Sequence, residues 1–472
     1  MTNWKLALRN LRRNSRRSIT TILTTVVGLA ALLLFGGYRS NIQYGSLTGF
    51  VQYTGHLQIQ VEGYFKDGGD NPLDYGIENY AAIIAKIKQD AALNQAIAVI
   101  TPNLQLGGIA GNFSAGISRS VLAFGLEPEA YNHMLRWNEF AVTSYAQSLP
   151  LSASNSDKVV LGTGVARRLR MCQLLAGEDC SRQTQASSKH TNASQSSSGI
   201  RPELAPDIAA LAQERAATPQ AAPGQQIELL AASQRGAPNV ASLQVIAAQN
   251  KGIKALDDLY LAMHLQQAQA LVYGKENPKV TAILVQLHKT ADLPWVQQKL
   301  QQLLKQASPS QTLEVLDFAT LNPIYGQTNQ FMDTMFGFIA LLIGVIVLFT
   351  VANTMSAAII ERTHEIGTLR ALGMRRNALR SLFLREATLL GGAGCLLGLL
   401  TALAIAWLIN HSGWTWTPPG YSYAYLVQVR ISDDLSMLAQ SSFWIMLITL
   451  LSAWWPAQRA ARMQVVEALR HH

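Results

Sequence analysis

Charge is absent from the long apolar stretches of this sequence. Four stretches contain no Asp, Glu, Lys or Arg, and they are residues 18–38, 334–360, 387–411 and 435–458. A helix needs about 20 mostly apolar residues to cross the ~30 Å hydrocarbon core of a bilayer, and each stretch meets that length. Proton-coupled carriers, ion pumps and voltage sensors place ionisable groups inside their spans, so these classes are not supported. The sequence predicts four transmembrane helices.

Motifs of soluble enzyme chemistry are also lacking. The sequence contains no G-x-x-x-x-G-K-[ST], no G-x-S-x-G and no H-E-x-x-H. P-loop nucleotide binding, a serine nucleophile elbow and a zincin metal site therefore find no support. His364 has no paired acid or nucleophile in its neighbourhood and is interpreted as a surface residue. We expect that the chain is not an enzyme by itself and that it binds no cofactor or metal.

Cysteine is scarce, with three in 472 residues. Cys172 and Cys180 lie between the first two spans, and Cys395 lies in the third. In an oxidising compartment a Cys172–Cys180 disulfide is predicted to close a small loop, and two free thiols are the alternative. A metal site is not expected there, because only His190 lies nearby.

Basic residues predict the orientation of the spans. Lys and Arg gather in residues 1–17, in the loop 361–386 and in the tail 459–472. Cytoplasmic segments carry the excess of positive charge, so we expect these three segments and both termini in the cytoplasm. Residues 39–333 and 412–434 are then expected on the outer, periplasmic side. The net charge of +9 reports this orientation, and nucleic-acid binding is not expected.

The segment 39–333 is too large for a loop and is expected to have its own core. Hydrophobic periodicity predicts strands at 56–61, 120–125, 158–162, 280–287 and 313–318, and helices at 80–88, 163–169 and 293–306. The predicted fold class is a membrane protein with four transmembrane α-helices and a large α+β periplasmic domain between the first two.

Within that domain we expect two β-α-β-like halves, at about 50–105 and 276–320, which flank an inserted β-rich subdomain at about 106–275. Residues 181–224 are rich in Ser, Gln, Ala and Pro. That composition predicts a flexible insertion, with one helix near 206–217.

Two smaller patterns concern the membrane region. Trp4, Leu8 and Leu11 recur at i, i+4 and i+7 among basic residues. This spacing predicts an amphipathic helix on the cytoplasmic membrane face, and an unstructured basic tail is the alternative. Gly394 and Gly398 form a G-x-x-x-G face for close helix packing. Asn353, near the end of the second span, is expected to hydrogen-bond between helices.

The loop after the second span reads ERTHEIGTLRALGMR over residues 361–375. Ile366, Leu369 and Leu372 recur every third residue, which predicts a short helix with one apolar edge. Glu365 near its start and Arg370 near its end suit the helix dipole. The segment is either an ordinary basic loop or a helix that docks into a groove of another protein.

This segment resembles the signature of ABC transporter permeases of the MacB/FtsX/lipoprotein-release type. The Asn-Thr-Met run at 353–355, the opening at 5–13 and the tail at 456–470 resemble the same family, as do residues 161–169 and 252–269. The resemblance implies contact with an ATPase by Glu361, Arg362, Glu365, Ile366, Gly367, Leu369, Arg370 and Gly373.

The resemblance further implies a permease subunit in the bacterial inner membrane. A macrolide exporter of this family has a fused N-terminal ATPase domain, whereas this chain starts at the membrane. A separate cytoplasmic ABC ATPase subunit, which holds ATP and Mg, is therefore the expected partner. A second permease copy is expected to pair through the first two spans, and a homodimer is favoured over a heterodimer. Membrane lipid and a periplasmic adaptor or lipoprotein are the further partners considered.

The expected activity is mechanotransmission. ATP hydrolysis would change the shape of the periplasmic domain and so export or extract a lipoprotein, lipid, peptide or drug from the outer side. The alternative is a non-transporting signal transmitter that activates a cell-wall hydrolase or senses a peptide. A membrane-anchored binding protein without a motor is the third hypothesis.

Overall fold

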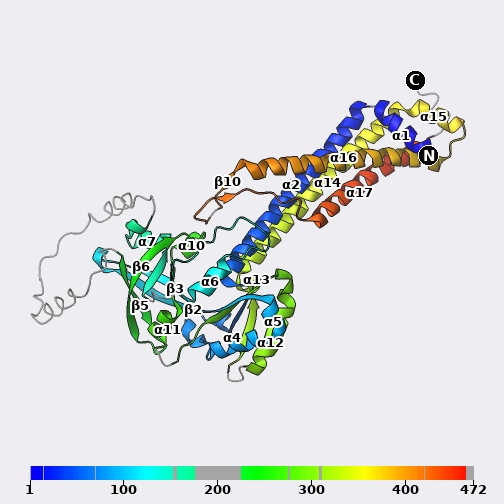
Figure 1. The fold of residues 1–472 in the computed structure, drawn as a ribbon. Helices are drawn as coiled ribbons and strands as arrows, with labels where there is room; N and C mark the ends of the chain where they lie inside the picture. Colours follow the sequence, from blue (N-terminus) through cyan, green and yellow to red (C-terminus); the bar gives the residue numbers. More distant parts are fainter. Residues whose placement is uncertain are drawn as a thin grey trace, which may run out of the picture. The chain divides into compact units, whose positions relative to one another are not determined.

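The structure is a computed structural model (Figure 1). It describes the chain except for residues 1, 14, 70, 153–156, 176–224, 275–276, 308–310, 419 and 464–472. The flexible insertion and the helix predicted at 206–217 lie outside the described residues. The chain divides into two compact units, of which the first is Met1–Gly45, Ile324–Trp416 and Tyr425–His472, and the second is Ser46–Pro323 and Thr417–Ala424.

The first unit is built from helices. Its elements are α1 (Thr2–Arg13), α2 (Ser15–Thr54), α14 (Pro323–Glu361), α15 (Thr363–Ala371), α16 (Arg376–Ser412), α17 (Leu435–Arg462) and the paired short strands β10 (Thr415–Trp416) and β11 (Tyr425–Leu426). Among the described residues, α2, α14, α16 and α17 are the helices long and apolar enough to cross a membrane. The prediction of four spans is confirmed. The basic segment before the first span also forms a helix, α1.

Two of the membrane-crossing helices are longer than a crossing requires. α2 has 40 residues and α14 has 39, whereas about 20 suffice for the hydrocarbon core. The C-terminal end of α2, from Ser46, belongs to the second unit, and α14 begins at Pro323, which also belongs to it. Both helices therefore connect the two units directly through the chain.

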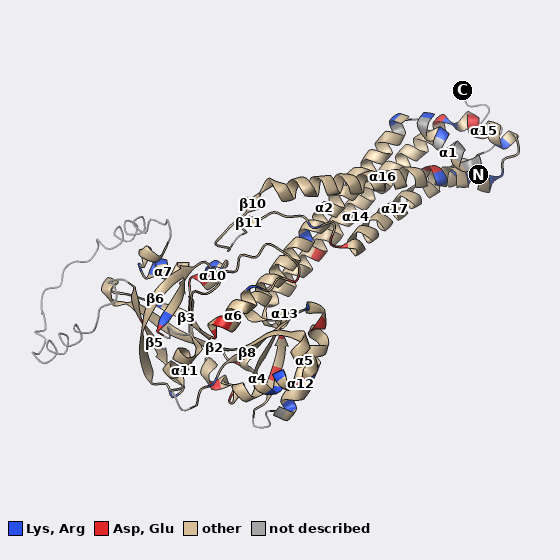
Figure 2. Cartoon of the chain, in the orientation of Figure 1, with Lys and Arg blue, Asp and Glu red and all other residues tan. Residues whose placement is uncertain are grey.

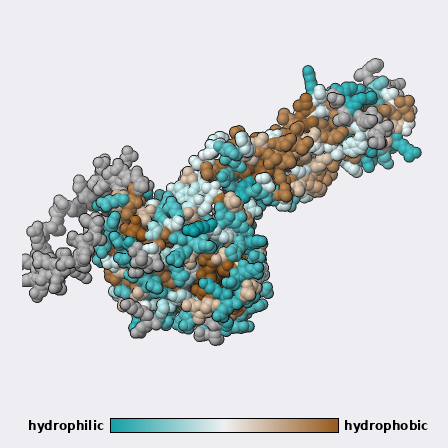
Figure 3. Space-filling view, viewed as in Figure 1, coloured by the Kyte–Doolittle hydropathy of each residue, from teal (hydrophilic) through white to brown (hydrophobic). Residues whose placement is uncertain are grey.

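The helical unit exposes an apolar surface. Leu341, Ile346 and Phe349 of α14 are 64%, 57% and 68% exposed, and Ile19 of α2 is 60% exposed. Figure 3 shows hydrophobic side chains gathered along these helices. Such a continuous apolar surface is unfavourable in water and is typical of contact with lipid or with another membrane helix.

The second unit is an α+β domain around one large sheet. Its strands are β1 (Leu57–Val61), β2 (Ile97–Asn112), β3 (Ile117–Leu126), β4 (Lys158–Gly162), β5 (Gln226–Ala232), β6 (Pro238–Gln249), β7 (Tyr260–His264), β8 (Ala282–Leu287) and β9 (Leu313–Asp317). Among the described residues they form a nine-stranded sheet in the order β3-β7-β4-β6-β5-β2-β8-β1-β9, with β2 also paired to β3. The strands predicted at 56–61, 280–287 and 313–318 correspond to β1, β8 and β9.

Short helices cover the sheet. They are α3 (Tyr64–Asp67), α4 (Tyr80–Gln89), α5 (Ala91–Ala96), α6 (Pro128–Leu135), α7 (Thr163–Arg168), α10 (Lys254–Asp257), α11 (Leu265–Val272), α12 (Leu293–Ala307) and α13 (Phe318–Leu321). Ile83 of α4 and Leu300 of α12 join the larger apolar core, whereas Met134 of α6 joins a second core. Because both faces are covered, strands such as β7 and β8 are buried along their whole length, as their continuous apolar runs predict.

β2 connects the two parts that the sequence predicted for this domain. Its first part, Ile97–Asn103, pairs with β8, next to β1 and β9. Its second part pairs with β3 from Asn103 onward and with β5 at Ile109–Gly111. The two predicted β-α-β-like halves and the inserted β-rich region therefore share one strand and one continuous sheet.

The segment Thr417–Ala424, between α16 and α17, packs within the second unit. The backbone N–H of Ser422 donates to the carbonyl of Gly252 at 2.8 Å, and the Lys254 N–H donates to the carbonyl of Gly420 at 2.9 Å. The Tyr423 ring stacks on Tyr145 with centroids 4.8 Å apart. Gly252 has φ +86°, and an added Cβ would lie 2.6 Å from the Tyr423 hydroxyl oxygen, so only glycine fits this turn.

Candidate functional site

The predicted coupling segment forms a short helix between two long ones. Glu361 is the last residue of α14, Arg362 stands between the helices, and α15 follows. The Met374 N–H donates to the carbonyl of Leu369 at 3.1 Å, and the Gly373 N–H donates to the carbonyl of Arg370 at 3.0 Å. This pair of bonds is a Schellman end, which needs a left-handed residue, and Gly373 supplies it with φ +92°. Gly373 thus ends α15.

α15 has one buried and one exposed side. Ile366 is 3% exposed and Gly367 is buried, whereas Glu365 and His364 are exposed. Of the other two residues on the predicted apolar edge, Leu369 is half-buried, and Leu372, directly after the end of α15, is 81% exposed. An edge that docks on a partner is exposed in the single chain, so docking by this edge stays a prediction.

Arg362 lies inside the helical unit. Its Nη1 lies 3.3 Å from Oε1 and 3.4 Å from Oε2 of Glu386 on α16, and its Nη2 donates to the Asn10 carbonyl of α1 at 3.1 Å. Asn10 Nδ2 in turn donates to Glu386 Oε1 at 2.7 Å. The side chains of Arg362 and Glu386 are only 8% and 5% exposed. No sequence pattern predicts Glu386 or Asn10 as partners of this segment.

Two further contacts hold α15 in place. Arg370 Nη1 donates to the carbonyls of Ala461 and Met463 at 3.1 and 2.9 Å. These carbonyls belong to the C-terminal end of α17, where helices leave carbonyl groups without intrahelical partners. Glu365 forms an exposed ion pair with Arg13 of α1. α15 is therefore connected to α1, α16 and α17.

Charged residues gather at the end of the helical unit that carries α1 and α15 (Figure 2). Three arginines there stack on tryptophans: Arg380 on Trp454, Arg385 on Trp4 and Arg459 on Trp455, with the Cζ atoms 4.6, 5.7 and 5.8 Å from the ring centroids. Tryptophan and arginine are enriched where helices leave the hydrocarbon core, so this belt indicates a membrane–water interface.

The glycines predicted to pack helices lie where α16 meets α2. A Cβ on Gly394 would lie 2.6 Å from Cβ of Thr25, and one on Gly398 would lie 3.1 Å from Cβ of Leu29. Asn353, by contrast, is exposed on α14, and within the described residues its side chain has no hydrogen bond. Its neighbour Thr354 makes a hydrogen bond between α14 and α2, because Thr21 Oγ1 donates to Thr354 Oγ1 at 3.0 Å.

Two of the three cysteines lie among the described residues. Cys172 is disulfide-bonded and Cys395 is free. The predicted partner Cys180 lies outside the described residues, so the Cys172–Cys180 pair stays a prediction. Among the described residues no group of three or more His, Cys, Asp or Glu side chains gathers in a metal-binding arrangement.

A buried histidine lies where the chain enters and leaves the sheet domain. His56 follows the end of α2, and its carbonyl accepts from the Phe318 N–H at 3.0 Å, just before α14. The Leu287 N–H donates to Nδ1 at 3.0 Å, so Nε2 carries the proton and donates to Thr290 Oγ1 at 3.1 Å. The Trp137 ring contacts the imidazole edge to face at 4.8 Å. We call the buried His56, with its backbone bond to Phe318 and its side-chain contacts, the entry joint.

Acid is expected to weaken the entry joint through His56. Burial lowers the pKa of His56 from 6.5 to about 4, so between these values the unfolded chain binds the proton and the folded chain does not. The free energy of unfolding must then fall as the pH is lowered from about 6.5 to 4. Thermal unfolding of the full chain in detergent across this range should show a smaller pH slope for His56→Gln.

The exposed His288 provides the matched control for this measurement. His288→Gln should keep the pH slope of the parent protein, since its imidazole is not buried. Parallel slopes for the parent protein and His56→Gln would contradict the role of His56.

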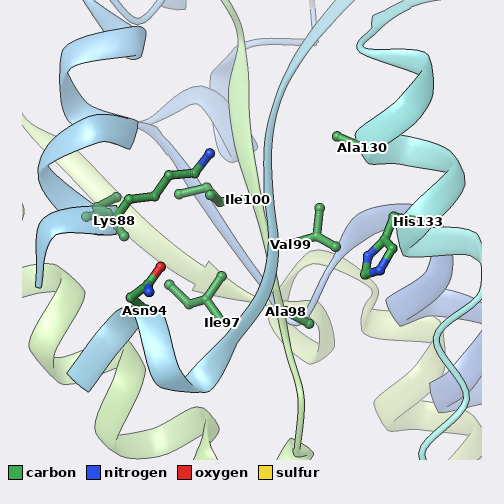
Figure 4. A pocket seen from close by; sticks show the side chains of 9 residues that line it. Lys88, Asn94, Ile97, Ala98, Val99, Ile100, Ala130 and His133 are labelled. Atoms are coloured by element: carbon green, nitrogen blue, oxygen red, sulfur yellow. The ribbon is translucent and has the colours of Figure 1, made fainter. Parts of the chain in front are cut away.

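A pocket of about 260 Å³ opens beside the first residues of β2. Figure 4 shows Lys88 of α4 on one side of the strand and His133 of α6 on the other, with Ile97 and Val99 between them. The pairing of β2 with β8 carries a register shift between Ile97 and Val99 at this point. We assign no binding site to this pocket.

Residues 336–465 match the family model described as FtsX-like permease C-terminal. This range holds most of α14 and all of α15, α16 and the described part of α17. The chain therefore carries an FtsX-like permease domain. It is homologous to MacB and to other ABC transporter permeases.

Two curated relatives illustrate this similarity. A macrolide export ATP-binding/permease protein MacB from Bdellovibrio bacteriovorus is 27% identical over 199 residues, which is 41% of this chain and 28% of the relative. The ABC transporter permease YtrF from Bacillus subtilis is 29% identical over 143 residues, which is 28% of this chain and 30% of the relative. The matched segments thus cover less than a third of either relative.

Among solved structures, the periplasmic region of MacB from Actinobacillus actinomycetemcomitans is similar to part of this chain. The match covers 58% of this chain and 94% of that region, with a TM-score of 0.31 and 13% sequence identity.

Proposed function

We propose that this chain is the permease subunit of an ABC transporter and that α15 docks on a cytoplasmic ATPase that holds ATP and Mg. The observation that carries the proposal is the FtsX-like permease domain, within which α15 offers an exposed side at a charged end of the helical unit. In this proposal the ATPase is a separate subunit, both termini are cytoplasmic, and the chain spans the bacterial inner membrane.

The proposed output is a change of shape in the α+β domain. α15 is separated from α14 only by Arg362, so a push on α15 reaches α14 directly. At the other end, α14 and α2 meet the sheet through neighbouring strands, because β1 and β9 are paired and the entry joint bonds His56 to Phe318. A stroke along either helix would therefore act on the β1–β9 edge of the nine-stranded sheet. Export or extraction of cargo on the outer side is the proposed consequence.

The proposed assembly contains a second copy that pairs through α2 and α14. An exposed Asn353 on an apolar helix would leave its amide without partners in lipid, and a second copy can supply them. Disulfide cross-linking between copies along α14 in membranes should fall with Asn353→Leu. The control Thr401→Leu, which removes a hydroxyl that donates to the Leu397 carbonyl of the same helix, α16, should keep the cross-linking. Equal cross-linking for both variants would count against pairing through Asn353.

Purification from native membranes tests the proposal. A small ATPase with a Walker motif should co-purify with the chain, and its ATP turnover should change when the chain is bound. Recovery of the chain without any ATPase would favour the third hypothesis, a membrane-anchored binding protein without a motor. If ATP changes the shape of the domain but displaces no lipoprotein, lipid, peptide or drug, the chain acts as a signal transmitter.

A further inference from the structure

Three elements far apart in sequence meet at one buried ion pair in the helical unit. Arg362 precedes α15, Glu386 lies on α16 and Asn10 lies on α1, and each contacts the other two. We infer that these residues form a clasp that makes α1 and α15 one composite docking surface for the ATPase. The inference rests on the proposed function, and it assigns Arg362 as a positioning residue that does not itself contact the ATPase.

Burial decides between positioning and direct contact. The side chains of Arg362 and Glu386 are 8% and 5% exposed, so neither offers an interaction surface to another protein. The guanidinium reaches both carboxylate oxygens, and the Asn10 amide donates a further hydrogen bond to Oε1. Removing either charge would leave the other buried without its partner, which is strongly unfavourable. The clasp therefore holds α1, α16 and the start of α15 together.

The exposed residues around the clasp indicate that it positions α1 beside α15. Arg13 of α1 and Glu365 of α15 form an ion pair on the outside, with side chains 58% and 50% exposed. Arg9 of α1 and His364 of α15 are exposed near them in sequence. A partner that docks on α15 would thus meet both helices. α1 then belongs to the docking apparatus, in addition to any contact with the membrane.

The decisive variant is Glu386→Gln in the full chain in lipid nanodiscs. Glutamine keeps the shape of the side chain and the bond from Asn10, but it removes the charge that Arg362 needs. Amide hydrogen exchange, without any ATPase present, should become at least about tenfold faster in both α1 and α15, because the two helices lose a shared contact. Arg376→Gln, which changes an exposed arginine at the start of α16, should leave both helices unchanged.

Charge reversal keeps the test independent of folding. Arg362→Glu alone should behave like Glu386→Gln or fail to fold, and Arg362→Glu with Glu386→Arg should regain slow exchange in α1. Unchanged α1 exchange in Glu386→Gln would overturn the inference. So would a double variant that folds with α1 exchange as fast as in Glu386→Gln.

Binding of the co-purified ATPase separates this inference from the proposed function. Both Glu386→Gln and Arg362→Gln should weaken that binding at least about tenfold, and Arg376→Gln should not. A loss confined to Arg362→Gln would show direct contact and overturn the positioning role. The opposite case is that no ATPase binds the parent protein, while Glu386→Gln still makes amide exchange in α1 faster. The clasp is then supported and the proposed function fails.

Discussion

Replacing Gly394 by leucine is expected to separate α16 from α2 and to prevent stable folding of the helical unit. A Cβ at this position would lie 2.6 Å from Cβ and 2.7 Å from Cγ2 of Thr25, and Thr25 is itself fully buried. The threonine Cβ is fixed to the backbone, so the helices must move apart. Overpacking of this kind costs about 3 kcal/mol or more when the backbone has to shift. The thermal midpoint in detergent and the yield of folded protein should both fall.

Gly392 provides a matched control on the same helix. It lies two residues earlier, and an added Cβ there would have no neighbour within 4 Å. Gly392→Leu should leave the thermal midpoint unchanged or raise it slightly, because leucine favours the helix. If Gly394→Leu were as stable as Gly392→Leu, the close packing of α16 on α2 would be disproved.

The largest functional effect is expected from Leu372→Asp. This leucine is 81% exposed next to the end of α15, so its side chain is available to a partner that docks there. Under the proposed function the aspartate should weaken ATPase binding by at least about tenfold, which corresponds to about 1.4 kcal/mol. The fold should be preserved, since Leu372 contributes no buried surface. Pull-down of the co-purified ATPase and the thermal midpoint measure the two quantities separately.

A comparable substitution on the sheet domain controls for nonspecific effects of the new charge. Val240 of β6 is 54% exposed, and Val240→Asp should bind the ATPase like the parent protein. Full ATPase binding by Leu372→Asp would contradict docking at α15. A bulky replacement of Gly367 would not test docking alone, because Gly367 is buried and such a change would also disturb packing.

The parts predicted well from sequence are those that depend on local patterns. Uncharged runs identify α2, α14, α16 and α17, since crossing lipid needs length and apolarity within one segment. β1 and β8 follow from period and composition in the same way. The sequence patterns do not predict β2, although with 16 residues it is the longest strand among the described residues. Its register shift near Val99 and its glycines at 107–108 interrupt the alternation by which strands are recognised.

The candidate site divides in the same manner. The residues of the coupling segment are recognisable from one continuous stretch. The stretch does not reveal that Arg362 points inward, because its partners Asn10 and Glu386 lie 352 and 24 residues away. Likewise Asn353 and Thr354 are neighbours of similar polarity, and only the position of α2 decides which of them faces another helix.

The sequence alone determined the four uncharged runs. These runs are enough to predict a membrane-spanning protein. Transfer from water to lipid is a sum over the residues of one segment, so no tertiary contact is needed to predict it. Tertiary structure alone decided the pairing of Arg362 with Glu386, the passage of β2 through the whole sheet and the bond from His56 to the start of α13. These contacts join residues whose proximity depends on packing, and packing is a property of the folded chain.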